Sequence, residues 1–536
     1  MAVTMAVPAT DRAARERYDR LEERVFARDQ VGVAQEFYGL VRENRPLPEM
    51  VRETVRIHAP YTNVPFHQRQ DSGDFRFVNN DHCLLSMRAT LRLMGHMPSE
   101  LSYLPMAQTM WYIPSALDPW NQLLGNAPGH YNRTGIPIAN TIQPLIHWPE
   151  IHAAPRTDPV QAQLDEWLTL VQRCQVEQAY SIMSTLLQDS ANRRQVLAHL
   201  MFGSLIDVQD RTLFRTSFTT GHKSYRARAT IEIAEKVGWE NAHDVIYAGI
   251  MDMGVGPHYY AMYEMACNVS RVVFQTKDAQ FKKNTKRMTR ADVDKTIDVI
   301  FHGDELATVR HIVSLLQAGK RVVEILETIQ VACAEVILQC GSPLAYNMPM
   351  HAYEYCNTLR WFYDNYFEHP HAVKLLFVCA SFVNEVANGQ RAFPGNEPRN
   401  IRAPRSASSL SQGDLLKKID ETIIALQPDD AVGLVQAYLR AGYDTKPLAS
   451  LVATTCSKWG NDPHNQEIPL CLVEDFGKSS SPERNRLIMA AASFSAGHRK
   501  YGDPLESFRR FSEAFGIDTK QDAKGDAPVE EALLDD

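Results

Sequence analysis

The feature that most constrains the fold of this chain is an internal repeat of helical segments. Apolar residues recur at three- and four-residue intervals through most of the sequence, a pattern that predicts amphipathic helices rather than strands. The repeat is clearest in the second half, where segments that begin at Asp304 and Asp429 both end in L-x-A-G, at Gly319 and Gly442. A glycine at that place is a typical helix stop. Self-similarity of this kind indicates an all-α protein built from copies of one helical unit.

Each copy carries a histidine at the same place. After the two segments above come a second helical segment, a segment that bears His351 or His464, and a last segment, at nearly the same spacing in both units. Two earlier parts of the chain fit this order more loosely and place His82 and His222 at the matching position, each followed by R-A-T at one offset. The sequence therefore predicts four degenerate repeats, each with one histidine at the entrance of the same helix.

The repeat also predicts how the chain is divided. We expect four repeats packed into one large helical body, with a Trp- and Pro-rich insertion after the first repeat. The predicted parts are an N-terminal extension (1–28), repeat 1 (29–113), a loop-rich insertion (114–155), repeat 2 (156–275), a linker (276–290), repeat 3 (291–387), a linker (388–412), repeat 4 (413–515) and an acidic flexible tail (516–536).

Charge and cysteine usage exclude several classes of function. The net charge is -8, which argues against nucleic acid or an anionic membrane as the main partner, because both select clustered Lys and Arg. The sequence has no run of about 18 apolar residues, so no membrane-spanning helix is predicted. The nine cysteines include no C-x-x-C pair, so we expect packed, reduced thiols and a cytoplasmic protein.

The four histidines suggest a shared metal site. If the units pack around a pseudo-symmetric axis, the side chains converge, and neutral imidazoles suit iron, copper or zinc. Their second ring nitrogens would need acceptors, and Asp81, Glu354 and Asp462 lie nearby in sequence. The alternative is structural, since a linear array of repeats would hold the histidines far apart. The separation of the His222 and His351 imidazoles decides between these alternatives. At less than about 5 Å the two rings could share an ion, and at more than about 10 Å they could not.

Other residues are secondary candidates. His58 lies on the second helical segment of the first unit, where the repeat does not support a functional histidine but where it could line a cavity. His258 follows the last helical segment of the second unit, and a structural role is the simpler interpretation. The chain has no nucleotide-binding glycine loop, no H-E-x-x-H and no C-x-x-C-H. These absences favour a mononuclear histidine site, and no catalytic residue is assigned.

The segment N-x-D-H-C-L-L-S-M-R-A-T-L-R-L-M-G, which ends at Gly95, resembles the histidine-bearing helix of the questin-oxidase-like family. That family is all-helical and oxidises or cleaves aromatic polyketide quinones, and some members are similar to non-haem iron oxygenases. The resemblance implies iron ligands here, which would be His82, His222, His351 and His464. Some members also use a lysine ligand. Lys374 is a candidate for it, although the repeat alignment pairs Lys374 with Arg486 and so argues against a special role.

The sequence thus leads to a functional hypothesis with alternatives. We expect an enzyme, a metal-dependent oxidoreductase with iron, that acts as an oxygenase or oxidase on an aromatic small molecule with O2 as co-substrate. Zinc, copper or no metal are the alternatives to iron. The alternative functions are a metal-free helical repeat protein for protein–protein interaction and a zinc-dependent hydrolase.

Overall fold

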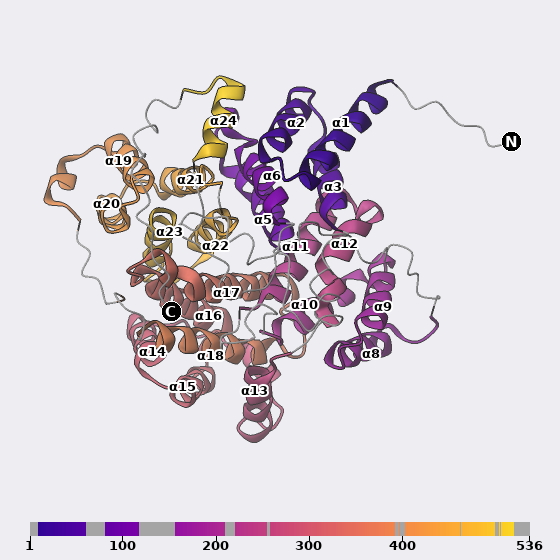
Figure 1. Cartoon of the computed structure of the whole chain (residues 1–536). Helices are drawn as coiled ribbons and strands as arrows, with labels where there is room; N and C mark the ends of the chain where they lie inside the picture. Colours follow the sequence, from indigo (N-terminus) through magenta and orange to yellow (C-terminus); the bar gives the residue numbers. More distant parts are fainter. Residues whose placement is uncertain are drawn as a thin grey trace, which may run out of the picture.

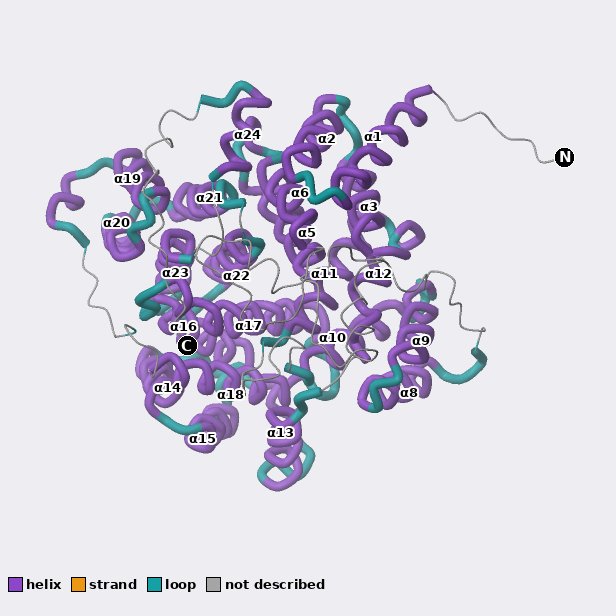
Figure 2. Tube along the Cα trace, viewed as in Figure 1, coloured by secondary structure: helices purple, strands orange, loops and turns teal. Residues whose placement is uncertain are grey.

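The computed structural model describes residues 9–59, 81–116, 156–208, 220–254, 258–391, 396, 403–460, 462–498, 503 and 505–518. Over these residues the protein is all-helical, and its only strand-like pairing is an isolated bridge between Lys286 and Lys320. Figure 2 shows helices joined by loops throughout. The prediction of an all-α protein is confirmed for the described part of the chain.

Within the described residues the helices follow one another in four groups of five, and the first two groups lie in the first half of the chain. The first group is α1 (Ala9–Phe26), α2 (Gln30–Arg42), α3 (Leu47–His58), α5 (Asp81–Leu93) and α6 (Leu104–Ala116). The second is α8 (Val160–Gln172), α9 (Val176–Gln188), α10 (Arg193–Leu205), α11 (His222–Val237) and α12 (His243–Ile250), and α13 (Ala261–Val272) comes after it.

The second half continues in the same order. The third group is α14 (Arg290–His302), α15 (Glu305–Gln317), α16 (Val322–Leu338), α17 (Asn347–Tyr366) and α18 (Ala372–Arg391). The fourth is α19 (Gln412–Ile424), α20 (Pro428–Arg440), α21 (Thr445–Cys456), α22 (His464–Lys478) and α23 (Asn485–Gly497), and α24 (Glu506–Phe515) is the last helix of the described residues. Short 3-10 turns lie at Met94–His96, Ser99–Leu101, Trp239–Asn241, Met251–Gly254, Asp278–Lys283, Pro343–Tyr346 and Arg405–Ser409.

Local sequence explains where the helices of the repeat begin and end. The Asp304 side chain accepts a hydrogen bond from the backbone of Ala307 and caps the start of α15, as a short acidic residue does best at that position. Gly319 and Gly442 follow α15 and α20 with φ values of +85° and +73°. This left-handed conformation closes the last turn of each helix and favours glycine.

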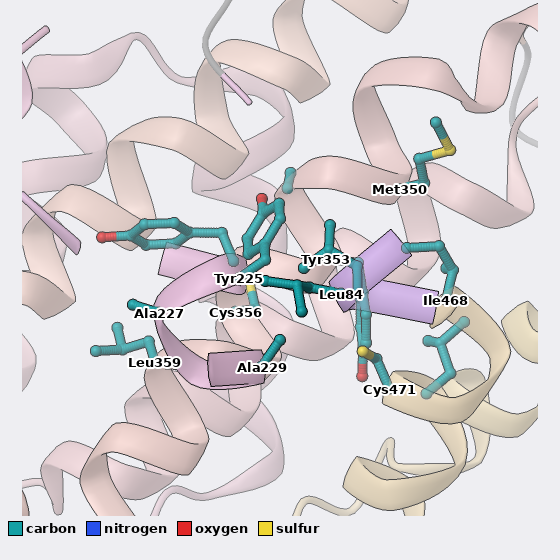
Figure 3. Close-up of a cluster of buried hydrophobic side chains, with 14 of the residues drawn as sticks. Leu84, Tyr225, Ala227, Ala229, Met350, Tyr353, Cys356, Leu359, Ile468 and Cys471 are labelled. Atoms are coloured by element: carbon teal, nitrogen blue, oxygen red, sulfur yellow. The ribbon is translucent and has the colours of Figure 1, made fainter. Parts of the chain in front are cut away.

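Four helices, one from each group, form the centre of the molecule. They are α5, α11, α17 and α22, which Figure 1 shows surrounded by the remaining helices. Each packs on the next, α5 on α11, α11 on α17, α17 on α22 and α22 on α5, so they close a ring. Apolar side chains of all four meet between them, among them Leu84, Tyr225, Tyr353, Ile468 and Cys471 (Figure 3).

One large apolar core joins the four groups, because a single cluster of buried side chains runs from Ala14 to Phe511. Helix α18 is long and apolar enough by composition to cross a membrane, but 78% of its apolar window is buried inside the protein. That burial is typical of a core helix.

Several predicted parts fall only partly within the described residues. The N-terminal extension contains α1, which packs on α2. The linker 276–290 contains a 3-10 turn that packs on α18. Three stretches of the predicted parts lie outside the described residues: 117–155 of the insertion, 392–402 of the linker except for residue 396, and 519–536 of the tail.

Candidate metal centre

The four histidines of the repeat all lie at or near the first residues of the central helices. His222 and His464 are the first residues of α11 and α22, His82 is the second residue of α5, and His351 lies in the first turns of α17. Their exposed fractions are 3% for His82, 5% for His222, 5% for His351 and 2% for His464. Four buried imidazoles therefore come from four different helices.

The structure brings the four imidazoles together in a closed ring. The ring centres are 4.9 Å apart for His82 and His222, 4.8 Å for His222 and His351, 5.2 Å for His351 and His464, and 4.5 Å for His464 and His82. An ion about 2.1 Å from each nitrogen would put neighbouring ring centres about 4.5–5.2 Å apart in square or tetrahedral arrangements. The ligand atoms of His82, His222 and His464 also lie within 4.8 Å of one another. These buried histidines could hold a metal ion.

Local acceptors fix the orientation of three of the rings. The Nδ1 of His351 donates to the carbonyl oxygen of Asn347 at 2.6 Å. The Nδ1 of His464 contacts Asp462 Oδ1 at 2.7 Å, and that of His222 contacts the Thr220 hydroxyl at 3.0 Å. A proton on Nδ1 leaves the lone pair on Nε2, the usual arrangement of a metal-binding histidine with a second partner.

Asp462 extends this support beyond the ring. Its Oδ1 also accepts from the backbone of His464 at 2.9 Å, and its Oδ2 contacts Nε2 of His498 at 3.2 Å. His498 is 2% exposed and stacks on Phe494. Asp462, His464 and His498 form a second group of closely spaced ligand atoms. The carboxylate therefore links the ring to a buried histidine at the end of α23.

Two buried glutamates accompany the ring. Glu354 and Glu467 lie three residues after His351 and His464, which places each of them one helical turn further on, on the same face of its helix. Glu467 has no exposed surface, and its Oε2 is 3.7 Å from Nδ1 of His82. Burial and the neighbouring Glu467 raise the pKa of Glu354 to about 8. The ring thus has carboxyl groups close to its imidazoles.

The His351 imidazole is held neutral. Burial, with the adjacent His222 and His464, lowers the pKa of His351 well below its usual range. Its Nε2 is buried and has no hydrogen-bond partner among the described residues. Neutral imidazole is the form that binds a metal ion.

A tyrosine joins two members of the ring through the backbone. The Tyr225 hydroxyl contacts the carbonyl oxygens of Thr220 and His351, so the start of α11 is tied to α17. Between Thr220 and His222, Gly221 has a φ of +80°, and a Cβ there would lie 3.0 Å from atoms of Tyr225 and Tyr355. Both the conformation and the space favour glycine.

A buried ion network locks the four helices together farther from their N-termini. Glu474 of α22 contacts Arg88 of α5 and Arg228 of α11, both at 3.3 Å, and both arginines also contact Glu232 at 3.1 Å. Burial raises the pKa of Glu474, but Arg228 and Arg88 outweigh it and lower that pKa to about 2. Arg228 also donates to Asn357 of α17. The network therefore fixes how the helices that carry the histidines are placed relative to one another.

Within the described part of the chain, the secondary candidates His258 and Lys374 contact carboxylates rather than the ring imidazoles. His258 contacts Asp207 at 2.6 Å, and Lys223 contacts the same carboxylate at 2.6 Å. Lys374 binds Asp278 at 2.9 Å near the start of α18. His58 is buried at the end of α3 and makes no ring contact with the four imidazoles in the part of the chain that the structure describes. Lys374 and His258 are thus each held against a buried aspartate, Asp278 and Asp207.

Sequence reasoning identified some of the surrounding groups and missed others. Asp462 and Glu354 were expected near the ring, and both lie there, whereas the Asp81 side chain lies outside what the structure describes. Glu467 was missed, although the H-x-x-E spacing that it shares with Glu354 was present in the sequence. His498 is a further residue of the surroundings, and only the fold brings it to Asp462.

No protein-family model, curated protein or solved structure matches this chain.

Proposed function

We propose that this protein is a metal-dependent oxygenase or oxidase, with non-haem iron as its metal and an aromatic small molecule and O2 as its substrates. The observation that carries the proposal is the closed ring of four buried imidazoles, spaced as ligands of one ion would be.

The residues fit a metal in their chemistry as well as their spacing. His351 is held neutral with a buried Nε2, and Asp462 and Asn347 orient their histidines through Nδ1. A mostly histidine site suits iron, zinc or copper rather than magnesium or calcium. When bound, a redox-active ion with an open position supplies O2 binding and activation beside the substrate.

The protein residues would hold, orient and shield this chemistry. The histidines set the geometry, and Asp462 keeps His464 in one tautomer. The apolar side chains between the central helices, such as Leu84 and Ile468, exclude water from the side of the ring that they cover. Burial of the ring favours chemistry on a substrate that is itself largely apolar.

We also infer that the four groups of helices are degenerate copies of one unit. The same order of five helices and the same place of the histidine in the fourth helix support this. Copies arranged around an axis place equivalent residues together, whereas a linear array would separate them. The convergence of the rings therefore favours an enzyme over a metal-free scaffold for protein–protein interaction.

The choice of iron and of an aromatic substrate rests on the resemblance of the segment ending at Gly95 to the questin-oxidase-like family. Oxygen consumption separates this proposal from a zinc hydrolase with the same ligands. The protein reconstituted with Fe²⁺ under anaerobic conditions should consume O2 with hydroxylated anthraquinones or related phenols, and the zinc form should not.

Metal analysis tests the proposal directly. Reconstituted protein should hold one equivalent of iron, and single changes of each ring histidine to alanine should remove most of it. His199→Ala, which alters a buried histidine outside the ring, serves as the matched control and should leave the metal in place. Less than about a tenth of an equivalent of any transition metal in the parent protein would refute the metal site.

A further inference from the structure

Two buried pairs, each of an aspartate and a histidine, occupy matching places in the second and fourth groups of helices. In each group the aspartate lies between the third and fourth helices, Asp207 after α10 and Asp462 before α22. The histidine follows the fifth helix, His258 after α12 and His498 directly after α23. Asp207 contacts Nδ1 of His258 at 2.6 Å, and Asp462 contacts Nε2 of His498 at 3.2 Å. The same kind of pair is therefore built twice beside the central helices.

The surroundings of the two histidines are alike as well. Each imidazole stacks on an aromatic ring, His258 on Tyr260 at an interplanar angle of 13° and His498 on Phe494 at 19°. Both side chains are buried. Because a carboxylate only accepts hydrogen bonds, the histidine is the donor in each pair. Stacking and burial restrict how each imidazole can turn, so its hydrogen bond holds the carboxylate in place.

The two aspartates differ in what they bind at the start of the central helix. Asp207 contacts Nζ of Lys223, the second residue of α11, at 2.6 Å. Asp462 contacts Nδ1 of His464, the first residue of α22 and a member of the ring, at 2.7 Å. The pair in the fourth group therefore acts on a ring imidazole, whereas the pair in the second group anchors a lysine that follows one.

We propose that His498 is a positioning residue of the metal centre, which acts on the ligand His464 through Asp462. This inference rests on the metal site of the proposed function and not on its oxygen chemistry. Oδ1 of Asp462 faces His464, and Oδ2 faces His498. With a donor on each oxygen, the carboxylate cannot turn about its Cβ–Cγ bond without weakening a hydrogen bond. It therefore keeps Nδ1 of His464 in line and Nε2 toward the metal.

Loss of the His498 donor would remove one of the contacts that fix Asp462. The terminal torsion of an aspartate is broad, so the carboxylate would turn toward its other donors and its hydrogen bond to His464 would lengthen or bend. Partners just beyond the direct ligands of a metal typically change its affinity by about 10–100-fold. His498 lies one contact further out, so its loss should fall at the low end of that range, about tenfold.

The test compares His498→Leu with His258→Leu, because both changes remove the imidazole of an equivalent pair. Zn²⁺ affinity is measured by competition with a chelator, on variants whose helix content by circular dichroism equals that of the parent. His498→Leu should bind Zn²⁺ about tenfold more weakly, and His258→Leu should stay within about threefold of the parent. Both should unfold at lower urea concentration, because each loses a buried hydrogen bond. An equal loss of Zn²⁺ affinity in the two variants would indicate a general effect on the fold and would overturn the proposal.

A second pair of variants tests the same contact with a smaller change of polarity, and it replaces the first pair if His498→Leu does not fold. In His498→Gln the amide N–H can reach the place of Nε2, whereas in His498→Asn, shorter by one methylene, it lies near the place of Nδ1. His498→Gln should therefore bind Zn²⁺ like the parent, and His498→Asn should show the loss. Equal Zn²⁺ affinities of these two variants would contradict a role for the hydrogen bond to Asp462.

A double-mutant cycle separates action through Asp462 from a merely structural role. Asp462→Asn removes the carboxylate on which His498 acts. On that background His498→Leu should lower the Zn²⁺ affinity further by less than about twofold, whereas independent effects would add in full. Full additivity would overturn the assignment of His498 as a positioning residue.

The outcomes for His498 are distinct from those for the proposed function. Parent Zn²⁺ affinity in a folded His498→Leu would overturn the role of His498 while the four-histidine site stands. A parent protein that binds no metal would refute both proposals together. O2 consumption does not enter this test, so a redox-inactive centre that His498 positions would still support the inference.

Discussion

Replacement of Asp462 by asparagine should weaken metal binding without unfolding the protein. The carboxylate accepts from Nδ1 of His464 at 2.7 Å and from the backbone of His464 at 2.9 Å, and it contacts His498 at 3.2 Å. Asparagine has the same shape and can still offer one carbonyl oxygen to His464. The change therefore removes the negative charge and keeps the packing.

The size of the effect follows from these contacts. Hydrogen bonds to a charged group contribute about 1.5–3 kcal/mol and neutral ones about 0.5–1.5 kcal/mol, so each loses about 1 kcal/mol. The bond to Nδ1 acts on the ring that binds the metal, and the contact with His498 holds the carboxylate in place. Together they predict a loss of about 1.4–2.7 kcal/mol, which is a 10–100-fold lower metal affinity. The backbone bond contributes instead to the start of α22, and its weakening should cost about 1 kcal/mol in the free energy of unfolding.

The assay is a competition titration with a chelator, run with Zn²⁺ on the parent, Asp462→Asn and Asp475→Asn. Asp475 is a second buried aspartate of α22, and it binds Gln330 and Tyr353 rather than the ring. Asp475→Asn should keep the parent affinity. If Asp462→Asn binds Zn²⁺ as tightly as the parent, Asp462 does not orient a metal ligand and the reasoning from its geometry is wrong.

Three further predictions concern stability, each measured on the metal-free protein by urea denaturation. Burial raises the pKa of Asp475 to about 7, so the folded state keeps a proton that the unfolded state releases above about pH 4. Stability should then fall by up to about 1.4 kcal/mol per pH unit as the pH rises from 4 to 7 and level off above, and Asp475→Asn should lack this slope. Gly249→Ala would place a Cβ 1.6 Å from Oγ1 of the buried Thr230, so it should lower the free energy of unfolding by about 1–3 kcal/mol. Gly249→Ala combined with Thr230→Ala should recover most of this stability. No recovery in the double variant would contradict the clash. Glu474→Gln removes the charge of a carboxylate that two buried arginines share, so it should lower the free energy of unfolding by about 3 kcal/mol. A loss below about 1 kcal/mol would mean that Glu232 alone satisfies both arginines.

The all-helical fold and the four histidines could be predicted because both are properties of local sequence. Helical periodicity and helix-stop glycines such as Gly319 act within a few residues, and a repeat shows the same signal more than once. The side chains at one place in each copy, such as His222 and His351, could then be compared. Convergence remained a conditional prediction, because the same repeats could stack in a row or close around an axis.

The rest of the centre depends on contacts between distant parts of the chain. The contact between Arg88 and Glu474 joins residues 386 positions apart, and no local pattern links them. His498 meets Asp462 only because α23 packs against α22. Glu467 was the exception, since its spacing after His464 was visible in the sequence, but nothing in the sequence indicated that it faces His82 on another helix. Tertiary packing therefore decides which polar residues join the ring.

The carboxylates beside the ring are needed to offset the positive charge that gathers at its centre. The N-terminal turns of four helices meet at the histidines, and each helix N-terminus carries a partial charge of about +0.5. Four neutral imidazoles do not offset this charge, and a divalent cation bound there would add to it. Glu467 beside His82, and Asp462 behind His464, place negative charge where the cation would lie. A centre without them would attract anions but repel its metal. With them it could hold a cation, and the helix N-termini would still favour a negatively charged group beside that cation.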